Sequence, residues 1–68
     1  MTTPRCFRCQ REPGDIPEYV DAAEAEHWTA DAIARSDGTF NAATNHFCCT
    51  DCYIALGMPT APNGWKAP

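Results

Sequence analysis

Two cysteine pairs with the spacing Cys-x-x-Cys constrain this chain more than any other feature of its sequence. The first pair is Cys6 and Cys9, and the second is Cys49 and Cys52. Each spacing lets one tight turn, called a knuckle below, bring two thiolates to the same ion. Two knuckles supply the four sulfurs of a closed structural zinc site. We therefore predict that Cys6, Cys9, Cys49 and Cys52 bind Zn²⁺.

Two residues near the second pair compete with these ligands. Cys48 could replace Cys49, although the resulting three-residue gap before Cys52 is less usual in zinc sites. His46 could also supply a ligand. Since side chains alternate along a strand, we expect Cys48 to point away from the site and to behave as a small, half-buried apolar residue.

The length of the chain explains why it needs a metal. Its 68 residues form one domain, residues 1–68, and a chain this short buries only about 60% of its unfolded surface. Disulfides fit poorly, because five cysteines leave one over. Residues 1–13 are polar and lack the apolar run of a secretory signal. We therefore expect a metal site in a reducing cytoplasm.

The charge of the chain argues against nucleic acid as the main partner. The formal net charge is −4, and four ligating thiolates with one divalent zinc would lower it to about −6. A basic patch is the usual footprint of a nucleic-acid-binding protein. Arg5, Arg8 and Arg11 surround the first pair, and we interpret them as cations that offset thiolate charge. The alternative is a nucleic-acid-associated zinc module, in which these arginines contact phosphates and Trp65 stacks on bases.

The sequence between the pairs predicts two short helices. Asp15 and Pro17 are typical of a helix start, and the pattern that follows predicts a helix over residues 18–27. Thr29 is a good N-cap for a second helix that ends near Arg35, so we expect a bend between the two helices.

The first helix carries an acidic stripe. Glu18, Asp21 and Glu24 recur at a spacing of three residues, which places them on one face. We interpret this face as solvated, and the alternative is a docking surface for a basic partner. Trp28 and Ile33 are the expected core residues of this region.

The second half of the chain predicts a β-hairpin followed by a helix. Residues 39–40 and 46–47 are β-prone and flank a turn-rich segment. A helix begins at the second cysteine pair, continues through residues 53–56 and is ended by Gly57. Cys52 falls in its first turn, where the helix dipole favours a thiolate. A knuckle, inserted helices, a hairpin and a C-terminal helix with the second pair make a small α+β zinc-bound domain, treble-clef-like or zinc-ribbon-like.

Residues 58–68 form a proline-rich tail that cannot be helical. Leaving Trp65 in water is costly, so we expect the tail to fold back onto the domain. The alternative is an exposed aromatic contact for a partner.

Several short motifs occur together in this chain. They are Gly38-Thr39-Phe40-Asn41, Asn45-His46-Phe47, Cys49-Thr50-Asp51-Cys52-Tyr53-Ile54, Gly57-Met58-Pro59 and Ala61-Pro62-Asn63-Gly64-Trp65. In combination they resemble a group of small proteins encoded by actinobacteriophages, such as those that infect mycobacteria. Residues 16–20 and the first cysteine pair match as well, whereas Cys48 and Phe40 depart from the group's pattern. The resemblance implies a viral, cytoplasmic, zinc-ribbon-like protein and implies no activity.

We expect no enzymatic activity. Four cysteines close a zinc site, whereas a catalytic zinc keeps one position open. A nuclease on a treble clef needs a histidine on the terminal helix, and residues 50–57 contain none. Cys48 and His46 could form a nucleophile and its base, but so small a chain supplies no pocket for a substrate. We predict a non-enzymatic phage accessory protein that binds a host or viral protein in the cytoplasm of a bacterial host, away from membranes. The alternative is the nucleic-acid-associated module or a transcriptional regulator.

Overall fold

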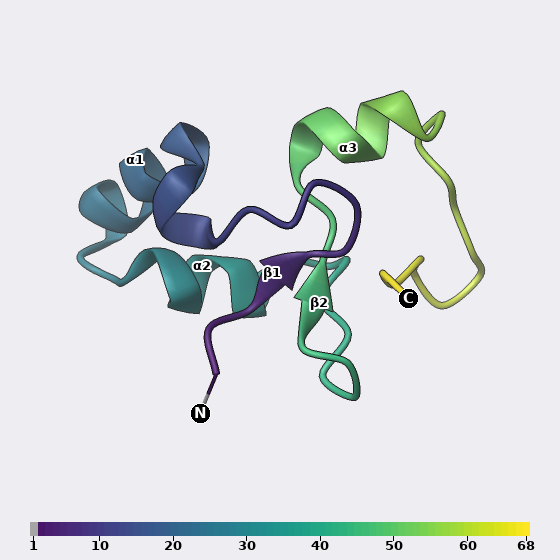
Figure 1. Ribbon diagram of the computed structural model, residues 1–68, viewed down its shortest axis with the longest axis horizontal. Coiled ribbons are helices and arrows are strands. Elements are labelled where there is room, and N and C mark those ends of the chain that lie inside the picture. Colours follow the sequence, from purple (N-terminus) through teal and green to yellow (C-terminus); the bar gives the residue numbers. More distant parts are fainter. Residues whose placement is uncertain (1) are drawn as a thin grey trace.

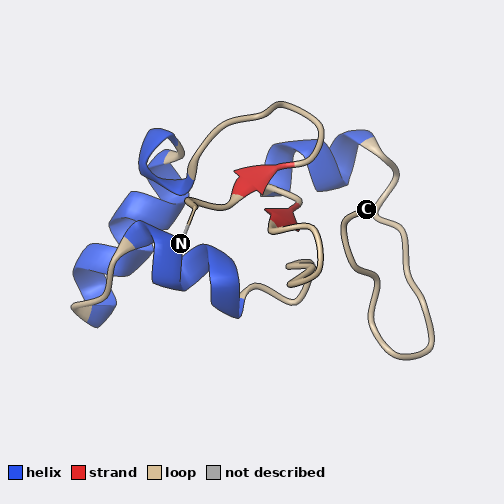
Figure 2. Ribbon diagram, turned by 60° about the horizontal axis from the view of Figure 1, so that its bottom comes forward, coloured by secondary structure: helices blue, strands red, loops and turns tan. Residues whose placement is uncertain are grey.

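The computed structural model describes residues 2–68 as a small α+β domain, in agreement with the predicted class (Figure 1). Helices α1 and α2 lie together on one side of a short sheet, and α3 and the tail lie on the other side (Figures 1 and 2). The elements, in chain order, are β1 Arg5–Cys6, a 3₁₀ turn Pro13–Asp15, α1 Pro17–Glu26, α2 Ala30–Ser36, β2 His46–Phe47 and α3 Thr50–Ala55.

Helix α1 begins and ends close to the predicted residues, with different caps. Ile16 is the N-cap and Pro17 the first helical residue, while the expected cap Asp15 belongs to the 3₁₀ turn. His27 ends the helix with a left-handed backbone, φ 58°. The Trp28 N–H then donates back to a carbonyl of the last turn. This closing bond satisfies a helical carbonyl that would otherwise lack a donor.

Helix α2 confirms the predicted bend. The Thr29 Oγ1 atom accepts a hydrogen bond from the Ala32 N–H at 3.1 Å, which satisfies a free donor at the helix start. Ile33 packs partly buried against the core. The prediction for Trp28 was wrong, because its side chain is 55% exposed. It lies just after the left-handed residue His27, in the turn between the two helices.

The predicted β-hairpin forms only in part. Asn41 and His46 make a single antiparallel bridge, and the sheet is a parallel pair in which β1 lies beside β2. Thr39 does not enter a ladder, because its hydroxyl bonds the Cys48 N–H at 3.0 Å and the Cys48 carbonyl at 3.3 Å. A side chain thus replaces the backbone pairing that an alternating strand would make at this point.

The core is built where the helices meet β2. Phe47 is completely buried, and its ring centroid lies 5.3 Å from that of Tyr19 on α1. Ile16 and Ala34 fill the space around them. The Tyr19 hydroxyl donates to Asp37 at 2.8 Å, so the one polar end of this ring pair is satisfied.

The tail folds back and covers the first knuckle and α3. The Trp65 ring lies 6.0 Å from Phe7 and 5.8 Å from Tyr53, measured between ring centroids. Two residues on, the buried Ala67 donates its N–H to the Thr39 carbonyl at 2.8 Å. The tail therefore joins three segments that are far apart in the chain.

We predict that Trp65→Ala will destabilise the domain by about 2 kcal/mol, because it removes a half-buried ring from two aromatic contacts. Trp28→Ala is the matched control and should change the free energy of unfolding by less than about 0.5 kcal/mol, because that ring is mainly in solvent. Chemical denaturation of the metal-loaded variants measures both. An equal cost for the two substitutions would contradict the packing described for the tail.

Candidate metal centre

The fold brings the four predicted ligands together. The sulfur atoms of Cys6, Cys9, Cys49 and Cys52 all lie within 4.8 Å of one another. The Cys9 and Cys49 sulfurs are 3.8 Å apart. A tetrahedral zinc with Zn–S bonds of about 2.3 Å requires sulfur–sulfur distances of about 3.8 Å. The arrangement thus has the size and donor chemistry of a four-thiolate metal site.

Short local structures position each sulfur. Cys6 ends β1, and the turn after it closes through a bond from the Gln10 N–H to the Cys6 carbonyl at 3.0 Å. Cys49 is the N-cap of α3, and Cys52 lies in the first turn of that helix. The Phe7 N–H bonds the Phe47 carbonyl at 2.9 Å. This bond holds the two knuckles side by side, although residues 10–48 separate them in the chain.

Backbone N–H groups also point at the sulfurs. The Arg11 N–H donates to Cys9, and the Cys52 N–H donates to Cys49. Such donors favour a thiolate over a thiol. Three of the four cysteines are buried, and Cys9 is exposed at the edge of the cluster.

Two arginines contact the sulfurs directly. Arg11 donates from Nε to the Cys9 sulfur at 3.3 Å and from Nη2 to the Cys49 sulfur at 3.6 Å. Arg8 donates from Nη1 to the Cys52 sulfur at 3.9 Å. Both arginines lie where they offset thiolate charge, as the sequence predicted.

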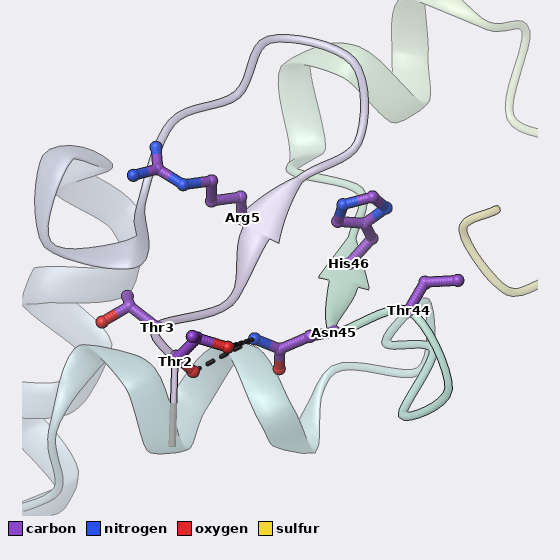
Figure 3. A pocket seen from close by; sticks show the side chains of 6 residues that line it. All are labelled: Thr2, Thr3, Arg5, Thr44, Asn45 and His46. Carbon is purple, nitrogen blue, oxygen red and sulfur yellow. Dashed lines mark hydrogen bonds between the residues drawn. The ribbon is translucent and has the colours of Figure 1, made fainter.

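Arg5 departs from that prediction. Its guanidinium donates to the Glu12 carboxylate at 2.8 Å and to the Gln10 carbonyl at 3.0 Å. Figure 3 shows the side chain extending away from His46, the neighbouring residue on β2. Arg5 therefore makes only exposed contacts with the loop after the first knuckle and contacts no cysteine sulfur.

The pKa values of the thiols follow from these contacts. Burial works to raise the pKa of Cys9, but the hydrogen bonds from Arg11 outweigh it and lower the pKa to about 6. Burial raises the pKa of Cys49 to about 12 and also raises that of Cys52. Thiolates this close repel one another, so a bound cation is needed before all four sulfurs ionise.

The two competing residues lie outside the cluster. The Cys48 thiol is only 2% exposed and contacts the Cys49 carbonyl at 3.7 Å. Burial raises the pKa of Cys48 to about 11, so it stays a thiol at neutral pH. His46 places Nδ1 3.0 Å from the Pro68 carbonyl oxygen. Neither residue replaces a ligand in this arrangement.

A separate cavity of about 190 Å³ lies beside the sheet (Figure 3). Asn45 donates to both the carbonyl and the hydroxyl of Thr2 across it, each at 3.0 Å. Its lining side chains are those of Thr2, Thr3, Arg5, Thr44, Asn45 and His46. His46 is the one residue of this lining that was a candidate ligand, and its Nδ1 contacts the Pro68 carbonyl oxygen, so the cavity is separate from the four-sulfur cluster.

No family model, curated protein or solved structure matches this chain. The resemblance to actinobacteriophage proteins therefore stays a prediction from the motifs.

We predict that Cys9→Ser and Cys49→Ser will each release the metal and unfold the domain. Metal binding supplies folding free energy on the order of 10 kcal/mol in small zinc modules. Cys48→Ser should keep the metal and cost about 1 kcal/mol, since its thiol only packs. Bound zinc and circular dichroism measure these effects. Metal loss in Cys48→Ser together with metal retention in Cys49→Ser would show that the ligands are misassigned.

Metal affinity should fall as the pH is lowered from about 8 to about 5, because protons compete with the metal for thiolates. Cys49, with a pKa of about 12, must release its proton on binding at any of these pH values. Cys9, with a pKa of about 6, is already a thiolate at neutral pH. Its protonation therefore competes with metal binding only below about pH 6. The fall should therefore steepen below about pH 6. Competition with a chelator of known pH dependence measures it, and a pH-independent affinity would rule out thiolate ligands.

Proposed function

We propose that this chain is a non-enzymatic accessory protein whose fold is held by a structural zinc ion and which acts by binding another protein. The observation that carries the proposal is the set of four cysteine sulfurs within 4.8 Å. Four protein ligands complete a tetrahedral zinc and leave no position for a substrate or an activated water.

Zinc is the metal that best fits this donor set. Tetrahedral sulfur ligands favour zinc among the common divalent ions, and zinc has no redox chemistry to supply. When bound, the ion would act as a cross-link between the two knuckles. The residues that would hold it are Cys6, Cys9, Cys49 and Cys52.

A treble-clef-like arrangement is the architecture that we propose for this site. The first knuckle follows β1, and a turn with one antiparallel bridge precedes the second pair. Helix α3 then begins at that pair, with Cys49 as its N-cap. Helices α1 and α2 are an insertion between the knuckle and the turn.

The proposed partner is a protein, and α1 offers it a surface. Glu18, Asp21 and Glu24 are exposed, and the ion pairs among the described residues all lie outside α1. Trp28 and Val20 add exposed apolar area, 55% and 40% exposed respectively. A tryptophan beside charged residues is typical of a protein-binding surface, and the acidic charge would favour a basic partner.

Nucleic acid fits the same surfaces less well. Arg8 and Arg11 donate to sulfurs and Arg5 is paired with Glu12, so their charges are already engaged. The net charge of −4 would also repel phosphates. These contacts favour a protein partner over the nucleic-acid-associated module.

Catalysis by Cys48 is disfavoured by its surroundings, because its thiol contacts a carbonyl and no base. The proposed setting, the cytoplasm of a phage-infected bacterium, rests on the motif resemblance. Within residues 2–68 no helix combines the length and the apolar character needed to cross a membrane.

The proposed partner surface is tested by removing two of the acidic charges on α1. Immobilised metal-loaded protein should retain a specific protein from a lysate of infected cells. Asp21→Asn with Glu24→Gln should lower that retention about tenfold, as expected for loss of charge complementarity. Ala42→Lys with Ala43→Lys changes net charge by the same two units at another exposed turn and should leave retention unchanged. Equal loss in both double variants, or salt-sensitive retention of DNA or RNA instead, would contradict the proposal.

A further inference from the structure

Arg11 is the one side chain in the described structure that bridges sulfurs of both knuckles. Its Nε lies 3.3 Å from the Cys9 sulfur and its Nη2 lies 3.6 Å from the Cys49 sulfur. Asp51, in the first turn of α3, approaches the same guanidinium at 3.7 Å. The planar fork of arginine donates in two directions from one fixed geometry, which lysine cannot do.

The charge of a metal-loaded site explains what such a bridge would do. Four thiolates and one divalent ion leave two negative charges in a largely buried cluster. Arg11 and Arg8 bring one positive charge each to within hydrogen-bond distance of three of the four sulfurs. The site and its two arginines are then neutral together, which lowers the cost of gathering four thiolates.

One of the four ligands is more exposed to solvent than the others. Cys6, Cys49 and Cys52 are buried, whereas Cys9 is exposed. A chelator or an alkylating reagent would therefore reach the Cys9 sulfur first. The Cys9 sulfur is also the one that makes the shortest contact with Arg11.

We propose that Arg11 is a positioning residue of the metal centre, which strengthens metal binding and shields the Cys9 sulfur from reagents in solution. This inference rests on the proposed structural metal site and adds a residue to it. Arg11 touches the ligands and not the metal, so it acts by holding two thiolates in place and by offsetting their charge.

Arg5 provides a matched control. It is an arginine at the other end of the same loop, with a side chain that is 50% exposed against 36% for Arg11. Its hydrogen bonds go to Glu12 and to the Gln10 carbonyl. Replacing Arg5 removes the same charge from the loop without removing a contact to sulfur.

The first experiment compares zinc affinities by competition with a chromophoric chelator. Arg11→Gln should bind zinc about 10-fold to 100-fold more weakly than the wild-type protein, the range found when a group that orients metal ligands is lost. The zinc affinity of Arg11→Lys should lie between those of the wild-type protein and Arg11→Gln, because lysine keeps the charge and loses the bridge. Arg5→Gln should stay within about twofold of the wild-type protein.

A second pair of readouts separates this role from a general loss of stability. In the cobalt-loaded protein, Arg11→Gln should move the thiolate-to-cobalt charge-transfer band to lower energy, since hydrogen bonds withdraw electron density from sulfur. In the zinc-loaded protein it should speed alkylation of Cys9 by iodoacetamide, located by mass spectrometry. Arg5→Gln should change neither readout.

The outcomes distinguish this inference from the proposed function. A wild-type protein that binds neither zinc nor cobalt overturns both. Metal binding by the wild-type protein, with Arg11→Gln matching Arg5→Gln in affinity, band position and alkylation rate, overturns the role of Arg11 alone. If Arg11→Gln does not fold, Arg11→Lys decides: wild-type affinity and an unchanged alkylation rate in that variant would overturn the bridging role.

Discussion

Four cysteine sulfurs within 4.8 Å of one another are the constraint on which the rest of this fold depends. The sheet that joins the two knuckles has only two residues in each strand, too few to hold them by backbone bonds alone. The core around Phe47 is correspondingly small. Thiolates at this separation repel one another, so a cation at their centre turns an unfavourable cluster into a cross-link. Helices α1 and α2 and the tail pack around a junction that a bound metal would fix.

The sequence predicted the parts of the fold that depend on local chemistry. Thr29 caps α2 as expected, and Gly57 follows α3 with a positive φ of 85°, a conformation that glycine adopts without strain. The predictions that failed depend on tertiary contacts. Trp28 is exposed because the chain turns at His27, and the hairpin is reduced because the Thr39 hydroxyl takes the place of a ladder. Hydrophobicity and β-propensity along the chain carry no information about either contact.

In the candidate site too, the sequence predicted the features that depend on local structure and not those that depend on tertiary contacts. Cysteine spacing was enough to choose four residues that the fold brings together, because a knuckle is a local structure. The arginines were recognised as a cluster, but only the three-dimensional arrangement separates Arg11 and Arg8, which contact sulfur, from Arg5, which does not. Figure 1 places α1 and α3 on opposite sides of the strands. The first turns of these two helices nevertheless approach one another, because Glu18 of α1 and Asp51 of α3 line one cavity together with Arg11.

The mass of the purified protein under native and denaturing conditions tests the central claim most directly. The account predicts a native mass higher by one zinc ion, lost on denaturation, with no disulfide. Iodoacetamide should modify no thiol rapidly in the native protein, since four are ligands and Cys48 is only 2% exposed, and all five cysteines in the denatured one. A native protein without metal, whose mass is lower by the four hydrogens of two disulfides, would contradict the account.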